Sequence, residues 1–207
     1  MPVNSSATFD ILYIASSTKR SYPDLGIYEL NFLSYFACLM SLYDGNPTAE
    51  WEYSFYKNEN GAPVSSAIAD AVKTLSECGE MKDYEKYFGI MPEGEISLEV
   101  YKGLSLFKKR MKYLDAACDC LLTDSIVSLA STLSLDPVIK ESTVHSLKML
   151  NSDDNDSLAS LHSQFHVIRE IVGLQKELFV PAHIWIQYLK LSSKDDIGRP
   201  NCEITSD

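Results

Sequence analysis

The spacing of two histidines in the sequence could support metal chemistry. His162 and His166 lie four positions apart, so on a helix they share one face and could bind one metal ion together. The acidic stretch 151–157 could supply a further ligand. However, the glutamate of the H-E-x-x-H pattern is missing, and the neighbouring Leu161 and Phe165 occupy the apolar side of the same helix. We therefore interpret both histidines as part of a polar, solvent-facing surface and expect no metal site.

The cysteines offer a second set of soft metal ligands. Cys118 and Cys120 form a C-x-C pair, but on a helix their side chains diverge by about 200°, and no second pair stands at zinc-site spacing. We expect a core thiol at Cys118 and an incidental one at Cys120. The odd number of scattered cysteines indicates reduced thiols rather than a disulfide framework; they are Cys38, Cys78, Cys118, Cys120 and Cys202.

Motifs for the common enzyme classes are missing. The sequence contains neither the G-x-x-x-x-G-K-[ST] phosphate loop nor the G-x-S-x-G nucleophile elbow. The paired carboxylates Asp195 and Asp196 follow the last apolar period, in a stretch that we expect to be too loose for catalytic geometry. The sequence therefore predicts a protein that is not an enzyme and has no cofactor.

One cluster of positive charge departs from the rest of this acidic chain, whose formal net charge is −11. Between Glu99 and Asp115 there are five basic residues and no acidic one: Lys102, Lys108, Lys109, Arg110 and Lys112. We expect all five to face solvent. They form either an ordinary solvated helix face or a local patch that contacts phosphates or an acidic partner surface. Because exposed charges act only over about 10 Å at physiological salt, the patch could touch DNA within a complex, although the net charge disfavours a free-standing DNA binder.

The composition describes an ordinary globular chain of 207 residues, with 45% hydrophobic and 23% charged residues. No apolar run reaches the roughly 18 residues of a spanning helix, so we expect no integral membrane protein. The first ten residues, MPVNSSATFD, lack the basic and apolar regions of a secretory signal. The sequence therefore predicts a cytoplasmic protein.

Hydrophobic periodicity predicts the elements of the N-terminal region, residues 1–96. Helices are expected over residues 7–17 and 25–42, and the second is apolar nearly all round, which indicates the centre of the core. Alternation at Trp51, Tyr53 and Phe55 predicts a short strand. A third helix begins at Ser65 or Ser66 and ends at Gly79, with an inner stripe of Ile68, Ala71, Val72 and Leu75.

A helix followed by a strand pair is typical of a winged helix. We expect the strand pair over residues 81–91, closed by a turn at residues 92–94. The exposed positions of the third helix carry no Arg, Asn or Gln for reading base edges, so this unit is better suited to protein docking.

Two apolar seams with alternating spacings of three and four predict the helical region, residues 97–191. The first contains Leu104, Phe107, Met111, Leu114, Cys118 and Leu121, and the second contains Leu158, Leu161, Phe165, Ile168 and Val172. A short helix with Ile126, Leu129 and Leu133 lies between them and ends at Asp136-Pro137. Residues 151–157 are a polar linker, Pro181 opens a last helix, and residues 192–207 are expected to form a flexible tail.

The order of these features resembles the middle components of bacterial ABC-three-component systems, including the small subunit of Lamassu-type antiphage complexes. The resemblance covers residues 7–135 by pattern, and it is carried by Ser21-Tyr22-Pro23-Asp24-Leu25, Leu30-Asn31-Phe32-Leu33-Ser34-Tyr35 and the unit from Gly61-Ala62-Pro63 to Gly79-Glu80-Met81. It implies a mainly α fold with a small winged-helix β-ribbon and a C-terminal helical pair. It also implies a non-catalytic adaptor that binds an SMC-like ABC ATPase and couples it to an effector, often a nuclease, on detecting foreign DNA.

A second resemblance is to antitoxin-type domains of the Panacea class, which share a helix, a strand and a Gly-Pro-like turn. This chain has Gly61-Ala62-Pro63 in place of the usual Tyr-Gly-Pro. The alternative function that it implies is neutralisation of a partner toxin.

Overall fold

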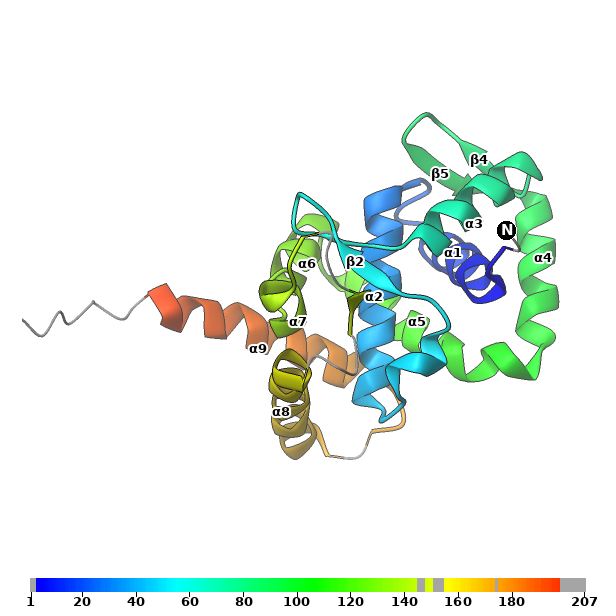
Figure 1. Cartoon of the computed structure of the whole chain (residues 1–207). Coiled ribbons are helices and arrows are strands. Elements are labelled where there is room, and N and C mark those ends of the chain that lie inside the picture. The colour runs from blue at the N-terminus through cyan, green and yellow to red at the C-terminus, as the bar shows by residue number, and fades with distance from the viewer. Residues whose placement is uncertain (1–2, 145–147, 151–154, 174, 198–207) are drawn as a thin grey trace, which may run out of the picture.

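The fold is mainly α-helical, as predicted. A computed structural model describes residues 3–144, 148–150, 155–173 and 175–197, of which 68% are helical. The α-helices are α1 (Ser5–Thr18), α2 (Ile27–Tyr43), α3 (Ser66–Glu77), α4 (Pro92–Gly103), α5 (Ser105–Thr123), α6 (Ile126–Leu133), α7 (Pro137–Glu141), α8 (Asn155–Val172) and α9 (Phe179–Ile197), and one 3-10 helix, η1, spans Thr48–Trp51 (Figure 1).

Two small antiparallel sheets complete the described part of the chain. The strands are β1 (Leu25–Gly26), β2 (Phe55–Lys57), β3 (Pro63–Val64), β4 (Met81–Asp83), β5 (Tyr87–Ile90) and β6 (Lys148–Met149). One sheet has the order β1-β5-β4 and the other the order β3-β2-β6. The strands are too short to form a core of their own, so both sheets rest on the helices.

Helix α2 forms the centre of the core, as its all-round apolar sequence predicted. Every residue from Leu30 to Tyr43 is buried, and α2 runs through the middle of the molecule between α1, α5 and α6 (Figure 1). Helix α1 is buried from Ser6 to Ala15. A polar link ties α2 to α7: the Tyr35 hydroxyl donates to Asp136, which also accepts the Val138 N–H at 3.1 Å as the N-cap of α7.

The strand predicted around Trp51, Tyr53 and Phe55 is mostly wrong. Trp51 belongs to η1, and only Phe55 begins a strand. Glu52 has a left-handed φ of 68°, which turns the chain between them and prevents continuous extension. The N-terminus of α1 holds this turn, because Ser6 Oγ donates to the Glu52 carboxylate. The apolar alternation therefore reflects three rings packed inward from a turning chain.

The third predicted helix and the strand pair are confirmed as α3, β4 and β5. The inner stripe of α3 is buried, and the chain leaves it at Gly79 with a φ of 74°. The turn expected at residues 92–94 is wrong, because Pro92 opens α4 at its first position, where a missing N–H costs no helical hydrogen bond. Strand β1 joins this pair in one sheet. That α3 and this sheet together form a winged helix stays a prediction.

The first apolar seam packs within the chain. Phe107, Leu114, Cys118 and Leu121 are buried on α5, which lies against α1, α2 and α9. Leu104, however, is 48% exposed, because the chain is extended there between α4 and α5 and the heptad does not continue across the break. The boundary proposed between residues 96 and 97 falls inside α4.

The second seam also packs inward, with Leu161, Phe165 and Ile168 buried on α8. Helix α9 crosses α8 and then extends away from the body (Figure 1). It begins at Phe179 and stays helical through Ile197, which corrects the flexible tail expected from residue 192. Residues 198–207 lie outside the described residues, as do 151–154 of the expected linker; residues 155–157 open α8.

Candidate functional site

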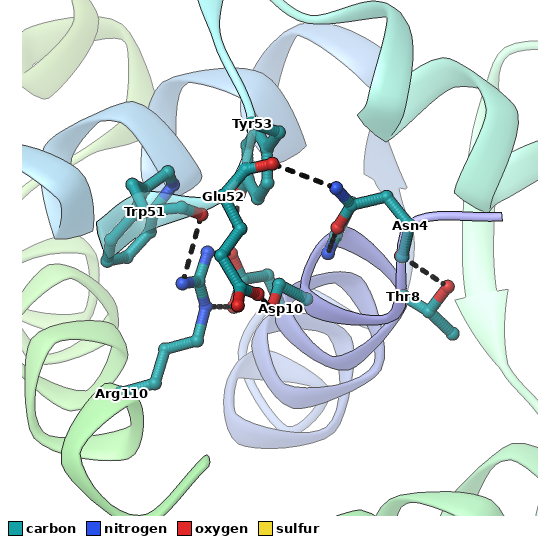
Figure 2. Close-up of polar contacts among 9 residues, drawn as sticks. Asn4, Thr8, Asp10, Trp51, Glu52, Tyr53 and Arg110 are labelled. Atoms are coloured by element: carbon teal, nitrogen blue, oxygen red, sulfur yellow. Dashed lines mark hydrogen bonds and ion pairs between the residues drawn. The ribbon is translucent and has the colours of Figure 1, made fainter. Parts of the chain in front are cut away.

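A buried ion pair positions the helix that carries most of the basic stretch. Arg110 of α5 donates from Nε to Asp10 Oδ1 at 2.5 Å and from Nη2 to Asp10 Oδ2 at 2.7 Å. Arg110 Nη1 donates to the Trp51 carbonyl at 3.2 Å, and the Tyr53 hydroxyl donates to Asp10 at 2.5 Å. Figure 2 shows these groups converging from α1, α5, the end of η1 and the chain just after it. The contacts fix the rotation of α5 about its axis.

Electrostatics keep the Arg110 guanidinium charged. Burial lowers the pKa of Arg110, but the charge and hydrogen bonds of Asp10 outweigh it and raise the pKa above its usual range. At Asp10 burial prevails and raises the carboxyl pKa above its usual value, although the charge and hydrogen bonds of Arg110 and the hydrogen bond from the Tyr53 hydroxyl lower it. The Trp51 ring stacks on the guanidinium, with its centroid 3.6 Å from Cζ.

The expectation that Arg110 faces solvent is therefore wrong: the residue is 7% exposed. Position 110 is three residues after Phe107 and four before Leu114. The Arg110 side chain therefore lies on the same side of α5 as the buried seam and not on the opposite, solvent-facing side. Its charge is matched by Asp10, which lies in a distant part of the sequence.

The four lysines of the basic stretch stay at the surface, and three of them meet acidic groups. Lys102 Nζ lies 2.9 Å from Glu99 Oε1, Lys109 Nζ lies 3.7 Å from Glu50 Oε2, and Lys112 Nζ lies 2.6 Å from Asp44 Oδ2. Lys108 is exposed. Glu99 is a neighbour of Lys102 on the same helix, whereas the fold supplies Glu50 and Asp44, which the sequence around Lys109 and Lys112 lacks. A role for these lysines in contacting a partner or DNA stays a prediction.

An apolar face on the outer side of α4 was missed by the sequence analysis. Ile96 is 68% exposed and Val100 is 66% exposed, and two leucines after the end of the helix are also exposed, Leu104 at 48% and Leu106 at 61%. We call these four residues the α4 face. The opposite side of α4 packs inward through Gly94 and Leu98, and α4 forms one edge of the molecule (Figure 1). The four-residue spacing of Ile96 and Val100 was the available signal.

A second apolar surface lies between α2 and α6. It is a hollow of about 290 Å³, which we call the α2–α6 hollow, lined by Tyr28, Glu29, Phe32, Ile126, Val127 and Ala130. Val127 on its rim is 75% exposed. The Tyr28 hydroxyl accepts hydrogen bonds from Asn58 at 3.2 Å and from Asn60 at 2.7 Å, which hold this wall in place.

Histidine and cysteine side chains are not gathered into a reactive centre in the described part of the chain. His162 and His166 are exposed on α8, as predicted, and no three His, Cys, Asp or Glu residues among those described lie close enough to hold a metal ion. Cys118 is a core thiol, as predicted, but Cys120 is buried as well. Burial raises the pKa of the Cys120 thiol to about 12, so it is a poor nucleophile at neutral pH.

Comparisons with known proteins add no relative. No protein-family model, curated protein or solved structure matches the chain. Among the described helices, none is by itself long and apolar enough to cross a membrane; α5 and α6 together would be, but they meet at a bend of 120°.

Proposed function

We propose that the protein is a non-catalytic adaptor subunit of a bacterial antiphage defence complex. It docks on an SMC-like ABC ATPase and couples that ATPase to an effector nuclease. The observation that carries the proposal is the presence of two separate apolar surfaces, the α4 face and the α2–α6 hollow. They lie on elements that are apart in the fold, since α4 forms one edge of the molecule and α6 lies beyond α2 (Figure 1). An adaptor needs more than one contact surface, since it must hold two components together.

Exposed apolar surface is costly in water, and its burial against another protein is the main driving force of association. The α2–α6 hollow suits such a contact because it is concave and its walls are mostly apolar. A large apolar side chain of the ATPase inserted between Phe32 and Val127 would act as an anchor residue of the interface. We therefore assign the hollow to the ATPase.

Co-purification tests this assignment. The chain is co-expressed with an SMC-like ABC ATPase from its host genome, and the amount of ATPase recovered is compared between Val127→Glu and the wild type. We expect Val127→Glu to reduce recovery at least about tenfold, because a charge in the hollow would be buried unpaired. Both proteins should melt at the same temperature, since Val127 is 75% exposed.

Ile171→Glu is the matched control, because Ile171 is 63% exposed on α8, away from the hollow. It should leave ATPase recovery unchanged. Equal recovery with both variants would rule out the hollow, and no recovery with the wild type would rule out the adaptor function. The antitoxin-type alternative predicts that one small toxin and no ATPase is recovered.

A further inference from the structure

We infer that a cavity between η1 and α5 binds a free α-amino acid with an apolar side chain. The cavity has a volume of about 280 Å³ and is lined in part by Trp51, Glu52 and Arg110. Figure 2 shows these three residues where the end of η1 meets α5. The cavity shares no lining residue with the α2–α6 hollow, so its ligand is independent of the proposed ATPase contact.

Charges of both signs line this cavity. Glu50 and Glu52 contribute carboxylates, and Lys109 and Arg110 contribute cations. Asp10, which is paired with Arg110, adds a further carboxylate, so the site has no excess of positive charge, which disfavours a simple anion such as phosphate. A simple cation would be repelled by Lys109 and Arg110. A zwitterion carries a carboxylate and an ammonium group in one small molecule, so both of its charges can be paired here.

Arg110 retains hydrogen-bond donors for a ligand carboxylate. A guanidinium group has five N–H donors. Nε and Nη2 each donate to Asp10, and Nη1 donates to the Trp51 carbonyl. A second N–H on Nη1 and a second on Nη2 therefore remain, and neither has an acceptor among the residues that the structure describes. Because Arg110 is 7% exposed, water can reach these donors only to a small extent, and a carboxylate in the cavity would satisfy them.

The two glutamates are available to an ammonium group. Glu52 Oε2 accepts a hydrogen bond from Ser6 Oγ, which holds this side chain on the wall of the cavity. Glu50 Oε2 lies 3.7 Å from Lys109 Nζ, which is longer than a hydrogen bond, and both side chains are more than half exposed. Exposed pairs of this kind are weak. A ligand that carries both charges can therefore replace the contact between Glu50 and Lys109 without leaving either group unpaired.

Apolar groups and the volume of the cavity define the rest of the ligand. Ala49, Trp51 and Leu106 line the cavity beside the charged residues and can contact an apolar side chain. An engineered cavity of ~150 Å³ holds benzene. A cavity of about 280 Å³ therefore accommodates an amino acid of the size of leucine or methionine.

Isothermal titration of the purified full-length chain with L-leucine and with L-methionine tests the inference. We expect a dissociation constant on the order of 100 μM for at least one of them, and a melting temperature raised by several degrees at about 10 mM ligand. Two analogues of leucine each lack one charge: isoamylamine has no carboxylate, and 4-methylpentanoate has no ammonium group. Both should bind at least about tenfold more weakly than leucine. No binding of either amino acid at about 10 mM, or an analogue that binds as tightly as leucine, would overturn the inference.

Two variants locate the ligand in the cavity. Lys109→Met and Glu50→Gln should each weaken amino-acid binding at least about tenfold. Both side chains are more than half exposed, so the melting temperature without ligand should stay unchanged. Lys108→Met is the matched control, because Lys108 is exposed on the same helix but does not line the cavity. Wild-type binding by both variants would overturn the assignment. These measurements need no ATPase, so they can fail while the Val127 result stands, and the reverse also holds.

Discussion

Arg110 and Asp10, 100 positions apart in sequence, form a two-pronged ion pair with nitrogen–oxygen distances of 2.5 and 2.7 Å. Two charges taken out of water each cost several kcal/mol, and such a pair is tolerated only when the remaining donors and acceptors are satisfied. Here the Trp51 carbonyl and the Tyr53 hydroxyl complete the set. The pair therefore fixes how α5 packs on α1, and α5 in turn presents Leu106 and the lysines at the surface.

Removing one partner of the pair should strongly destabilise the fold. Arg110→Met leaves the Asp10 carboxylate buried without its counter-ion, and we expect a loss of about 3–5 kcal/mol in the free energy of unfolding. Urea denaturation measures it. The Asp10→Asn/Arg110→Met double variant should lose less than the sum of the single changes. Lys108→Met is the matched control on the same helix and should change stability by less than about 0.5 kcal/mol.

Asp136 gives stability an unusual pH dependence. Burial raises the pKa of Asp136 from 3.8 to about 6, although the hydrogen bond from Tyr35 and the Val138 N–H lower it. The folded state therefore holds this proton more tightly than the unfolded state. The associated stability is fully present below about pH 4 and is lost as the pH rises through about 6. This contribution to the free energy of unfolding is about 3 kcal/mol, because the pKa of Asp136 rises from 3.8 to about 6.

The Asp136→Asn variant tests this dependence. Its amide oxygen can still accept from the Val138 N–H, but it does not titrate. The stability of the wild type minus that of the variant, measured by urea unfolding at several pH values, should fall between about pH 4 and pH 6. Taking the difference removes the opposite effect of carboxylates with a lowered pKa, such as Asp44 beside Lys112 and Asp124 beside Lys190. A constant difference across that range would contradict the prediction.

Long periodic segments made most of the fold predictable. The two seams have spacings that only a helix can place on one side, and α2 is apolar nearly all round, as a helix at the centre of the core requires. Tertiary packing therefore agreed with the local sequence in these helices. The strand prediction from Trp51 to Phe55 was wrong because the left-handed turn at Glu52 is held by α1, which is far away in sequence. Local alternation contains no information about such a contact.

The exposed basic and apolar surfaces were harder to predict for the same reason. Arg110 looked like part of a charge cluster because its partner is 100 positions away. Leu104 fitted the spacing of the first seam, yet it lies at the break between α4 and α5 and is exposed. Sequence spacing shows which residues share a face, but it does not show which face another element covers.

The cysteines should differ sharply in reactivity. Cys38 and Cys118 are buried, and burial raises the pKa of both thiols above their usual range, whereas Cys78 is exposed. Brief treatment of the native protein with iodoacetamide, followed by peptide mass spectrometry, should label Cys78 and leave Cys38, Cys118 and Cys120 unlabelled. All four should be labelled in urea. Labelling of Cys118 in the native state at the rate of Cys78 would contradict the burial of the α5 seam.

Lys108 and Lys109 are the residues with which to test the predicted basic contact, because Arg110 is buried in the ion pair with Asp10. The double variant Lys108→Glu/Lys109→Glu changes the local charge by about four units while leaving the Asp10 pair intact. We expect ATPase recovery and DNA association of the complex to fall several-fold at low salt, and the difference to shrink as salt is added. Lys73→Glu, on an exposed lysine of α3, should have no such effect. If the double variant assembles and binds DNA like the wild type at every salt concentration, then these lysines form only a solvated helix face, on which Lys109 contacts Asn46 Oδ1 and Glu50.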